Sequence, residues 1–128
     1  MNSMQAMIDG MNAQSQRERA ESQMTLGELI ERLEQMPKDT EIQGLAGLNS
    51  YRGYYSDLAF DPTDNYEQAG SLLERCKDAM GKVFTGYKGG DYVMGALTPL
   101  WVADYGRCGQ KLIAINDDGS IKTGEEDL

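Results

Sequence analysis

Residues 25–37 read TLGELIERLEQMP, and this stretch predicts the first helix of the fold. Thr25 and Glu28 have the spacing of a capping box, in which each side chain accepts a hydrogen bond from the other residue's backbone N–H. One apolar face recurs at intervals of three and four residues, through Leu26, Leu29, Ile30, Leu33 and Met36. Pro37 ends the helix because proline cannot continue its hydrogen-bond ladder.

A second helix is expected to end at about Met80. Ser71 and Glu74 repeat the capping-box spacing, and Gly81 stands where a helix C-cap is common. The apolar stripe of this helix consists of Leu72, Leu73, Cys76, Ala79 and Met80. Because Cys76 belongs to the stripe, we expect a buried and unreactive thiol.

Strands are expected on either side of the second helix. Alternating apolar residues indicate strands at 40–48 and 54–60, and in the second strand Tyr55, Leu58 and Phe60 are the expected buried members. Residues 82–94 indicate two short strands around a glycine-rich loop, and 100–105 and 111–115 indicate two more. The sequence therefore predicts an α+β fold with two helices packed on a largely antiparallel sheet of five to six strands.

Three segments divide the chain: an extension at 1–23, a single α+β domain at 24–115, and an acidic tail at 116–128. The extension is rich in Met, Gln, Asn and Ser, and its apolar residues have roughly helical spacing: Met1, Met4, Met7, Ile8 and Met11. It is either a solvated helix or disordered lead-in, or an arm that packs on another subunit through its methionines. An Asp118-Gly119 turn is expected at the start of the tail.

Composition excludes several classes of function. The 128 residues contain no histidine and two cysteines, which excludes histidine-based nucleophile pairs, His-ligated zinc, a four-thiolate metal site and a disulfide framework. No apolar run approaches the ~20 residues of a membrane span, and no signal-peptide core is present. We expect a cytosolic protein without a membrane partner. A net charge of −9 argues against binding to nucleic acid.

The charge is unevenly distributed. Residues 1–47 carry eight acids and four bases, a net of −4, and residues 113–128 carry five acids and one base, again −4. Residues 48–112 carry eight acids and seven bases, a net of −1, and they contain every aromatic residue of the chain. A ligand site is therefore expected in this middle segment.

The middle segment holds the candidate anion-binding residues. Residues 86–90 read GYKGG, although the spacing is not that of a P-loop. Arg52 stands among three tyrosines, and Arg107 lies in a turn flanked by glycine. These types of residue stack on nucleobases and bind phosphates, but an exposed hairpin lysine and an aromatic sheet with surface cations explain them equally. The candidate ligand-binding residues are Arg52, Phe84, Tyr87, Lys88, Trp101 and Arg107, of which Phe84 and Trp101 are also candidates for the core.

Catalysis has little support in the sequence. Asp57, Asp91 and Asp104 are the acids that could serve as a general base or hold a metal, but no spacing pairs them. We therefore expect no enzyme, no metal and no cofactor.

Three motifs, in order, resemble a family of small bacteriophage proteins. They are SYRGYYSDLA at 50–59, Gly81-Lys82 with FTGYKGGDY at 84–92 and Met94, and TPLWVA at 98–103 with Tyr105-Gly106. The resemblance covers about residues 24 to 115. In its length, its expected α+β fold and its candidate binding residues, the chain is similar to the first Thoeris anti-defence family. It implies a homo-oligomeric sponge, with sites between subunits, that sequesters a cyclic ADP-ribose signal in the cytoplasm of the infected bacterial host without cleaving it.

Two alternatives belong to other classes. An acidic inhibitor or virion accessory protein would imitate nucleic acid and block a host enzyme that binds DNA or RNA, with Glu28, Glu31 and Glu34 on its acidic face. A small phosphate-handling enzyme would instead turn over a nucleotide.

Overall fold

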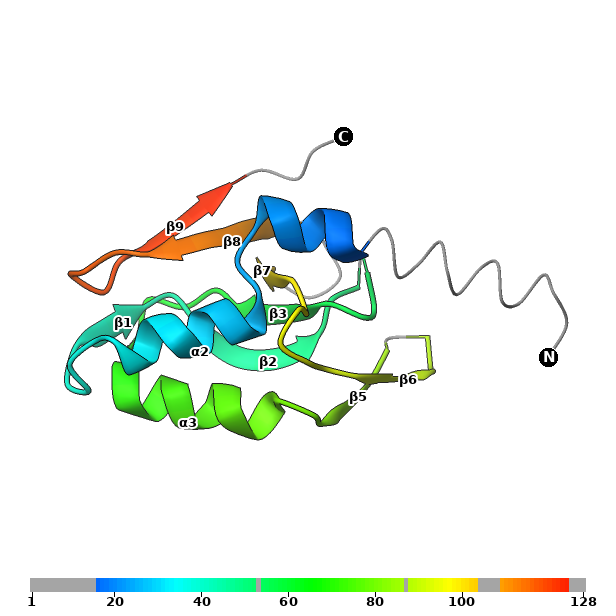
Figure 1. Cartoon of the computed structure of the whole chain (residues 1–128), viewed down its shortest axis with the longest axis horizontal. Coiled ribbons are helices and arrows are strands. Elements are labelled where there is room, and N and C mark those ends of the chain that lie inside the picture. The colour runs from blue at the N-terminus through cyan, green and yellow to red at the C-terminus, as the bar shows by residue number, and fades with distance from the viewer. Residues whose placement is uncertain (1–15, 53, 87, 104–108, 125–128) are drawn as a thin grey trace, which may run out of the picture.

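The computed structural model describes residues 16–52, 54–86, 88–103 and 109–124 (Figure 1). Residues 16–22 are helical, and two longer helices follow, α2 (Leu26–Glu34) and α3 (Ala69–Ala79). The strands are β1 (Glu41–Gln43), β2 (Ala46–Ser50), β3 (Leu58–Asp61), β4 (Tyr66–Gln68), β5 (Val83–Thr85), β6 (Asp91–Val93), β7 (Leu100–Val102), β8 (Gln110–Ile115) and β9 (Ile121–Gly124). The expected α+β class is confirmed.

The main sheet is mixed. Its order is β2-β3-β7-β8-β9, and β3 and β7 run parallel while the other neighbours are antiparallel. A parallel pair needs a crossover connection, which here contains α3. The β5–β6 hairpin and the β1–β4 pair form separate two-stranded sheets. The sequence prediction was wrong in assigning the hairpin strands to the main sheet and in expecting two helices where the described residues contain three.

The first helix forms as predicted. The Thr25 side chain accepts a hydrogen bond from the Glu28 N–H, and the Glu28 carboxylate accepts one from the Thr25 N–H. The three leucines of the apolar face are buried: Leu26, Leu29 and Leu33. The capping box thus fixes where α2 begins, and its apolar face fixes which side meets the core.

The second helix begins earlier than predicted. α3 starts at Ala69, and its N-cap Gln68 makes no side-chain capping bond. Ser71 lies inside the helix and donates to the carboxylate of Glu67 instead, so the capping box predicted there was wrong. At the other end Gly81 adopts φ +79°, as expected of a residue that ends a helix. The expected burial of Cys76 is confirmed, and desolvation raises the pKa of its thiol to about 12.

The strand predicted at 40–48 is divided in two at Gly44. This glycine has φ +96°, a conformation that breaks an extended strand, so β1 pairs with β4 whereas β2 pairs with β3. The strand predicted at 54–60 starts only at Leu58. The described residues of 51–57, which are 51, 52 and 54–57, instead form a loop, closed by the bonds from the Tyr51 N–H to the Asp57 carbonyl and from the Asp57 N–H to the Tyr54 carbonyl.

The two faces of the main sheet carry different cores. Leu58 and Phe60 of β3, with Leu100 of β7, face α2 and α3 and belong to the large apolar cluster. Side chains alternate along a strand, so Ala59 and Trp101 lie on the opposite face, where they cluster with Tyr51 and Ala103. The structure therefore has an apolar face covered by two helices and a smaller aromatic face.

The folded sheet continues past residue 115, where the sequence predicted the start of an acidic tail. β9 pairs with β8 through a turn in which the Gly119 N–H donates to the Asn116 carbonyl. Ile121 is half-buried against the core, and this burial keeps the strand on the sheet. No helix in the described ranges has the length and apolar character needed to cross a membrane.

Candidate functional site

The loop at 51–57 lies at the junction of the three motifs found in the sequence. The Tyr55 ring packs edge-on against Tyr92 of β6, with ring centroids 6.1 Å apart. A Cβ added at Gly86 would stand 2.9 Å from the Tyr55 ring, so only glycine allows this close approach of the hairpin loop. On the other side the Tyr51 hydroxyl accepts a hydrogen bond from the Gly109 N–H. The fold thus brings the β5–β6 hairpin and Gly109, the residue before β8, to one loop.

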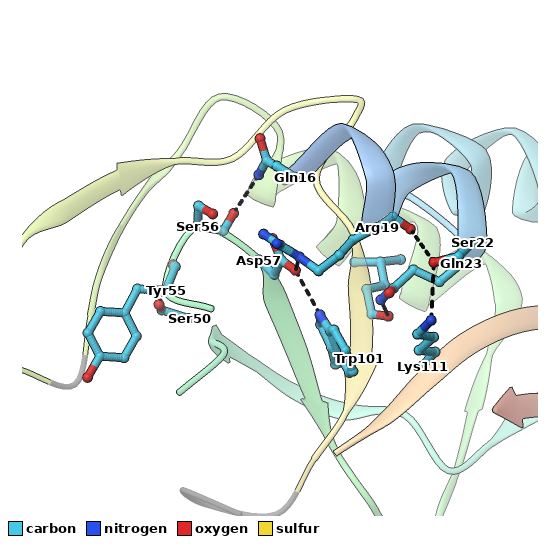
Figure 2. Close-up of polar contacts among 11 residues, drawn as sticks. Gln16, Arg19, Ser22, Gln23, Ser50, Tyr55, Ser56, Asp57, Trp101 and Lys111 are labelled. Atoms are coloured by element: carbon cyan, nitrogen blue, oxygen red, sulfur yellow. Dashed lines mark hydrogen bonds and ion pairs between the residues drawn. The ribbon is translucent and has the colours of Figure 1, made fainter. Parts of the chain in front are cut away.

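The carboxylate of Asp57 is at the centre of this region and is fully buried. Its two oxygens accept from Arg19, at 2.7 Å from Nε and 3.0 Å from Nη2, and Oδ2 also accepts from Trp101 Nε1 at 2.9 Å. Figure 2 shows Arg19 reaching from the helix at 16–22 to Asp57, with the Trp101 indole on the other side of the carboxylate. A buried charge needs such partners because water cannot solvate it.

Three aromatic rings stack beside this ion pair. The Tyr51 and Trp101 centroids are 4.5 Å apart at an interplanar angle of 19°, and Tyr54 stacks on Trp101 at 5.9 Å and 28°. The Arg19 guanidinium carbon lies 3.8 Å from the centroid of the Tyr54 ring. The guanidinium therefore has a carboxylate at one edge and lies over an aromatic ring.

The six candidate ligand-binding residues occupy different environments. Lys88 is exposed, Arg52 is half-buried, and Phe84 is half-buried against the apolar core with Lys82 Nζ 5.7 Å from its ring. Tyr87 and Arg107 lie outside the described residues. Trp101 is fully buried, because its position on β7 turns it inward under Tyr51 and Tyr54. It is a core residue in this structure and presents no surface to a ligand.

Two of the three acids considered for catalysis lie in the described ranges, and they have separate partners. Asp57 is held by Arg19, whereas Asp91 is exposed on β6 and accepts from the Thr85 hydroxyl at 3.3 Å. Asp104 lies outside the described residues. Within the ranges that the structure describes, no group of three His, Cys, Asp or Glu side chains is placed to hold a metal ion.

Sequence reasoning missed Arg19 altogether. It stands in the segment set aside as an extension, 38 residues from Asp57, and no local pattern links two positions so far apart. Tyr54 was noted only as a neighbour of Arg52. One feature of the sequence does point to such a contact. Residues 16–22 read QRERAES and contain no apolar residue larger than alanine, so a helix formed by them can pack on the domain only through polar side chains.

No protein-family model, no curated protein and no solved structure matches this chain.

Proposed function

We propose that this protein is a phage anti-defence protein that binds and sequesters a nucleotide-type signal, a cyclic ADP-ribose isomer, in the cytoplasm of the infected bacterial host and does not cleave it. The observation that carries the proposal is the convergence of the 51–57 loop and the β5–β6 hairpin, joined by the contact of Tyr55 with Tyr92 and Gly86. These are the segments whose motifs resemble the first Thoeris anti-defence family. Binding without turnover also suits a chain that contains no histidine.

The chemistry at this end of the molecule suits a ligand that combines an aromatic base with phosphates. Arg52 and Lys88 supply positive charge, and Tyr54, whose ring packs on Arg19 and Trp101, has 38% of its surface exposed to a ligand. Lys88 stands on a tight turn closed by bonds from the Gly86 N–H to the Gly90 carbonyl and from the Gly89 N–H to the Gly86 carbonyl. Trp101 was predicted to contact the ligand, but in this proposal it packs beneath Tyr54 and supports that ring.

The proposed site is completed by a second copy of the chain. The outer face of the β5–β6 hairpin carries Val83 and Val93 as a cross-strand pair, exposed by 50% and 69%. Leu97 nearby in the sequence is 67% exposed. Apolar side chains exposed close to a candidate site are typical of a surface that meets another subunit. A homo-oligomer would enclose a small ligand that one chain alone leaves open to solvent.

Isothermal titration with cyclic ADP-ribose isomers tests the proposal. We expect binding by the wild-type chain and a loss of at least about tenfold in affinity in Arg52→Ala and in Lys88→Ala, the cost of one charge-assisted contact. Lys38→Ala is the matched control, because Lys38 is also exposed but lies beside Gly70 at the start of α3, whereas the hairpin follows the end of α3. Mass spectrometry of the released ligand should find it intact. Absence of heat at tens of micromolar protein would refute nucleotide binding.

The alternative of an acidic inhibitor has one observation in its favour. Glu28, Glu31 and Glu34 are all exposed along α2. The triple change to glutamine removes their charge, and the Glu28→Gln member of the set preserves an acceptor for the capping bond from the Thr25 N–H. If this variant loses activity against a host nucleic-acid enzyme while Arg52→Ala keeps it, the inhibitor is the correct function and the sponge is not.

A further inference from the structure

The aromatic face of the main sheet contains a site built for a guanidinium group. We propose that Tyr54, Trp101 and Asp57 form a binding site for an arginine side chain, which Arg19 fills from within the same chain and which another arginine can occupy when the helix at 16–22 is released. This proposal does not rest on the proposed function, although Tyr54 and Trp101 take part in both, because its ligand is a cation held by the Asp57 carboxylate.

The geometry matches the chemistry of a guanidinium more closely than that of an ammonium. The contact through Nε and Nη2 to both oxygens of Asp57 requires a planar fork of donors, which arginine has and lysine lacks. The Tyr54 ring lies 3.8 Å from the guanidinium carbon, within the range of a cation–π interaction. The indole N–H of Trp101 fixes the carboxylate from its other side, so the site is oriented before any cation enters.

The helix that supplies Arg19 is attached chiefly by polar contacts. Besides the ion pair, Gln16 Nε2 donates to the Ser56 carbonyl at 3.1 Å, and Lys111 Nζ donates to the Ser22 hydroxyl at 3.2 Å (Figure 2). Its largest apolar residue is Ala20, so hydrophobic burial contributes little to holding it in place. Arg19 is one anchor of this helix, with a side chain only 11% exposed, and the buried Gln23 that follows the helix is another, since its Nε2 donates to the Leu100 carbonyl at 2.7 Å.

Release of this helix would uncover the site without disturbing the main core. The residues behind Trp101 on the other side of the sheet are packed against α2 and α3, and none of them contributes to the Arg19–Asp57 hydrogen bonds. Asp57 would then be a carboxylate that has lost its cation in a largely apolar setting, a situation that favours capture of another cation. Arginine from a second copy and arginine from a different protein share this chemistry.

The experiment uses the fluorescence of Trp101, which is the single tryptophan of the chain and part of the site. In full-length Arg19→Ala, titration with ethylguanidinium should shift the Trp101 emission saturably and raise the melting temperature by a few degrees. Ethylammonium at the same ionic strength should have a much smaller effect, and Arg19→Ala/Asp57→Asn should respond to neither. Arg17→Ala is the matched control, since Arg17 is exposed on the same helix and the native site stays filled.

A peptide titration identifies the source of the arginine, and a second variant replaces Arg19→Ala if that protein does not fold. If a peptide of residues 16–24 binds Arg19→Ala and its Arg19→Ala version does not, the source is the same helix of a second copy. If ethylguanidinium binds and the peptide does not, the source is a different protein. Arg19→Gln replaces Arg19→Ala if the latter is unfolded. A folded variant that does not respond to ethylguanidinium, or responds equally to ethylammonium, would overturn the proposal.

Discussion

The two faces of the main sheet are stabilised by different means. On one face, α2 and α3 bury a continuous set of leucine, isoleucine and phenylalanine side chains, and the free energy comes from apolar area removed from water. On the other face, a cluster of two aromatic and two alanine residues is completed by an ion pair to a polar helix. The first face therefore depends on shape and volume, whereas the second depends on one correctly placed charge.

The largest effect is expected from Asp57→Ala on the aromatic face. The change leaves the Arg19 guanidinium and the Trp101 N–H without the carboxylate that they share, and loss of one partner of a buried pair costs about 3–5 kcal/mol. Urea unfolding measured through Trp101 fluorescence checks this value.

The control for Asp57→Ala is an ion pair on the surface. Asp117 bonds to Arg32 at 2.6 Å but is 98% exposed, so Asp117→Ala should cost less than about 1 kcal/mol. If the two substitutions cost the same, burial does not distinguish the Arg19–Asp57 pair and the contrast between the two faces fails.

The next effect in size is a cavity on the apolar face. Leu29 of α2 is fully buried, and Leu29→Ala should destabilise the fold by about 2–5 kcal/mol, because apolar contacts are lost and the space cannot close completely. The emission of Trp101 in the folded state should remain that of the wild type, since Leu29 lies on the other side of the sheet. A shifted emission would show that the two faces are coupled through the strands.

Local patterns predicted the apolar face much better than the aromatic one. Thr25, Glu28 and the leucines of α2 were identified correctly because a cap and a helical stripe are both encoded within one short segment. The Arg19–Asp57 contact and the burial of Trp101 depend on which distant segments become neighbours. The parallel pairing of β3 with β7 brings Asp57 and Trp101 together, although α3 and the β5–β6 hairpin separate these strands in the sequence. The division at Gly44 was also missed, because alternation continues across it although the backbone turns.

A smaller effect is expected at the residue that connects the two regions. Thr25 lies between the helix at 16–22 and α2, and it is paired with Pro99 beside β7. Thr25→Ala removes the acceptor for the Glu28 N–H and should cost about 1 kcal/mol, whereas Thr25→Ser should keep most of the stability. Thermal unfolding of the three proteins measures this. Equal losses in both variants would show that packing of the threonine methyl matters more than the cap.

The smallest effect is a dependence on pH at the rim of the apolar face. Burial raises the pKa of Glu67, but hydrogen bonds from Arg75 and Ser71 and the charge of Arg75 together outweigh it, so the pKa lies below its ordinary value. A carboxyl with a lowered pKa in the folded state contributes stability that is present above its unfolded pKa and is lost as the pH falls through the folded one. Glu67→Gln should therefore be less stable than the wild type at pH 7, and the difference should shrink below roughly pH 4.5. Urea unfolding from about pH 3 to pH 7 measures it. If the difference in stability between the two proteins does not change with pH, the charge of Glu67 does not stabilise the fold. Arg75 would then act through its hydrogen bonds to the Leu45 and Gly47 carbonyls.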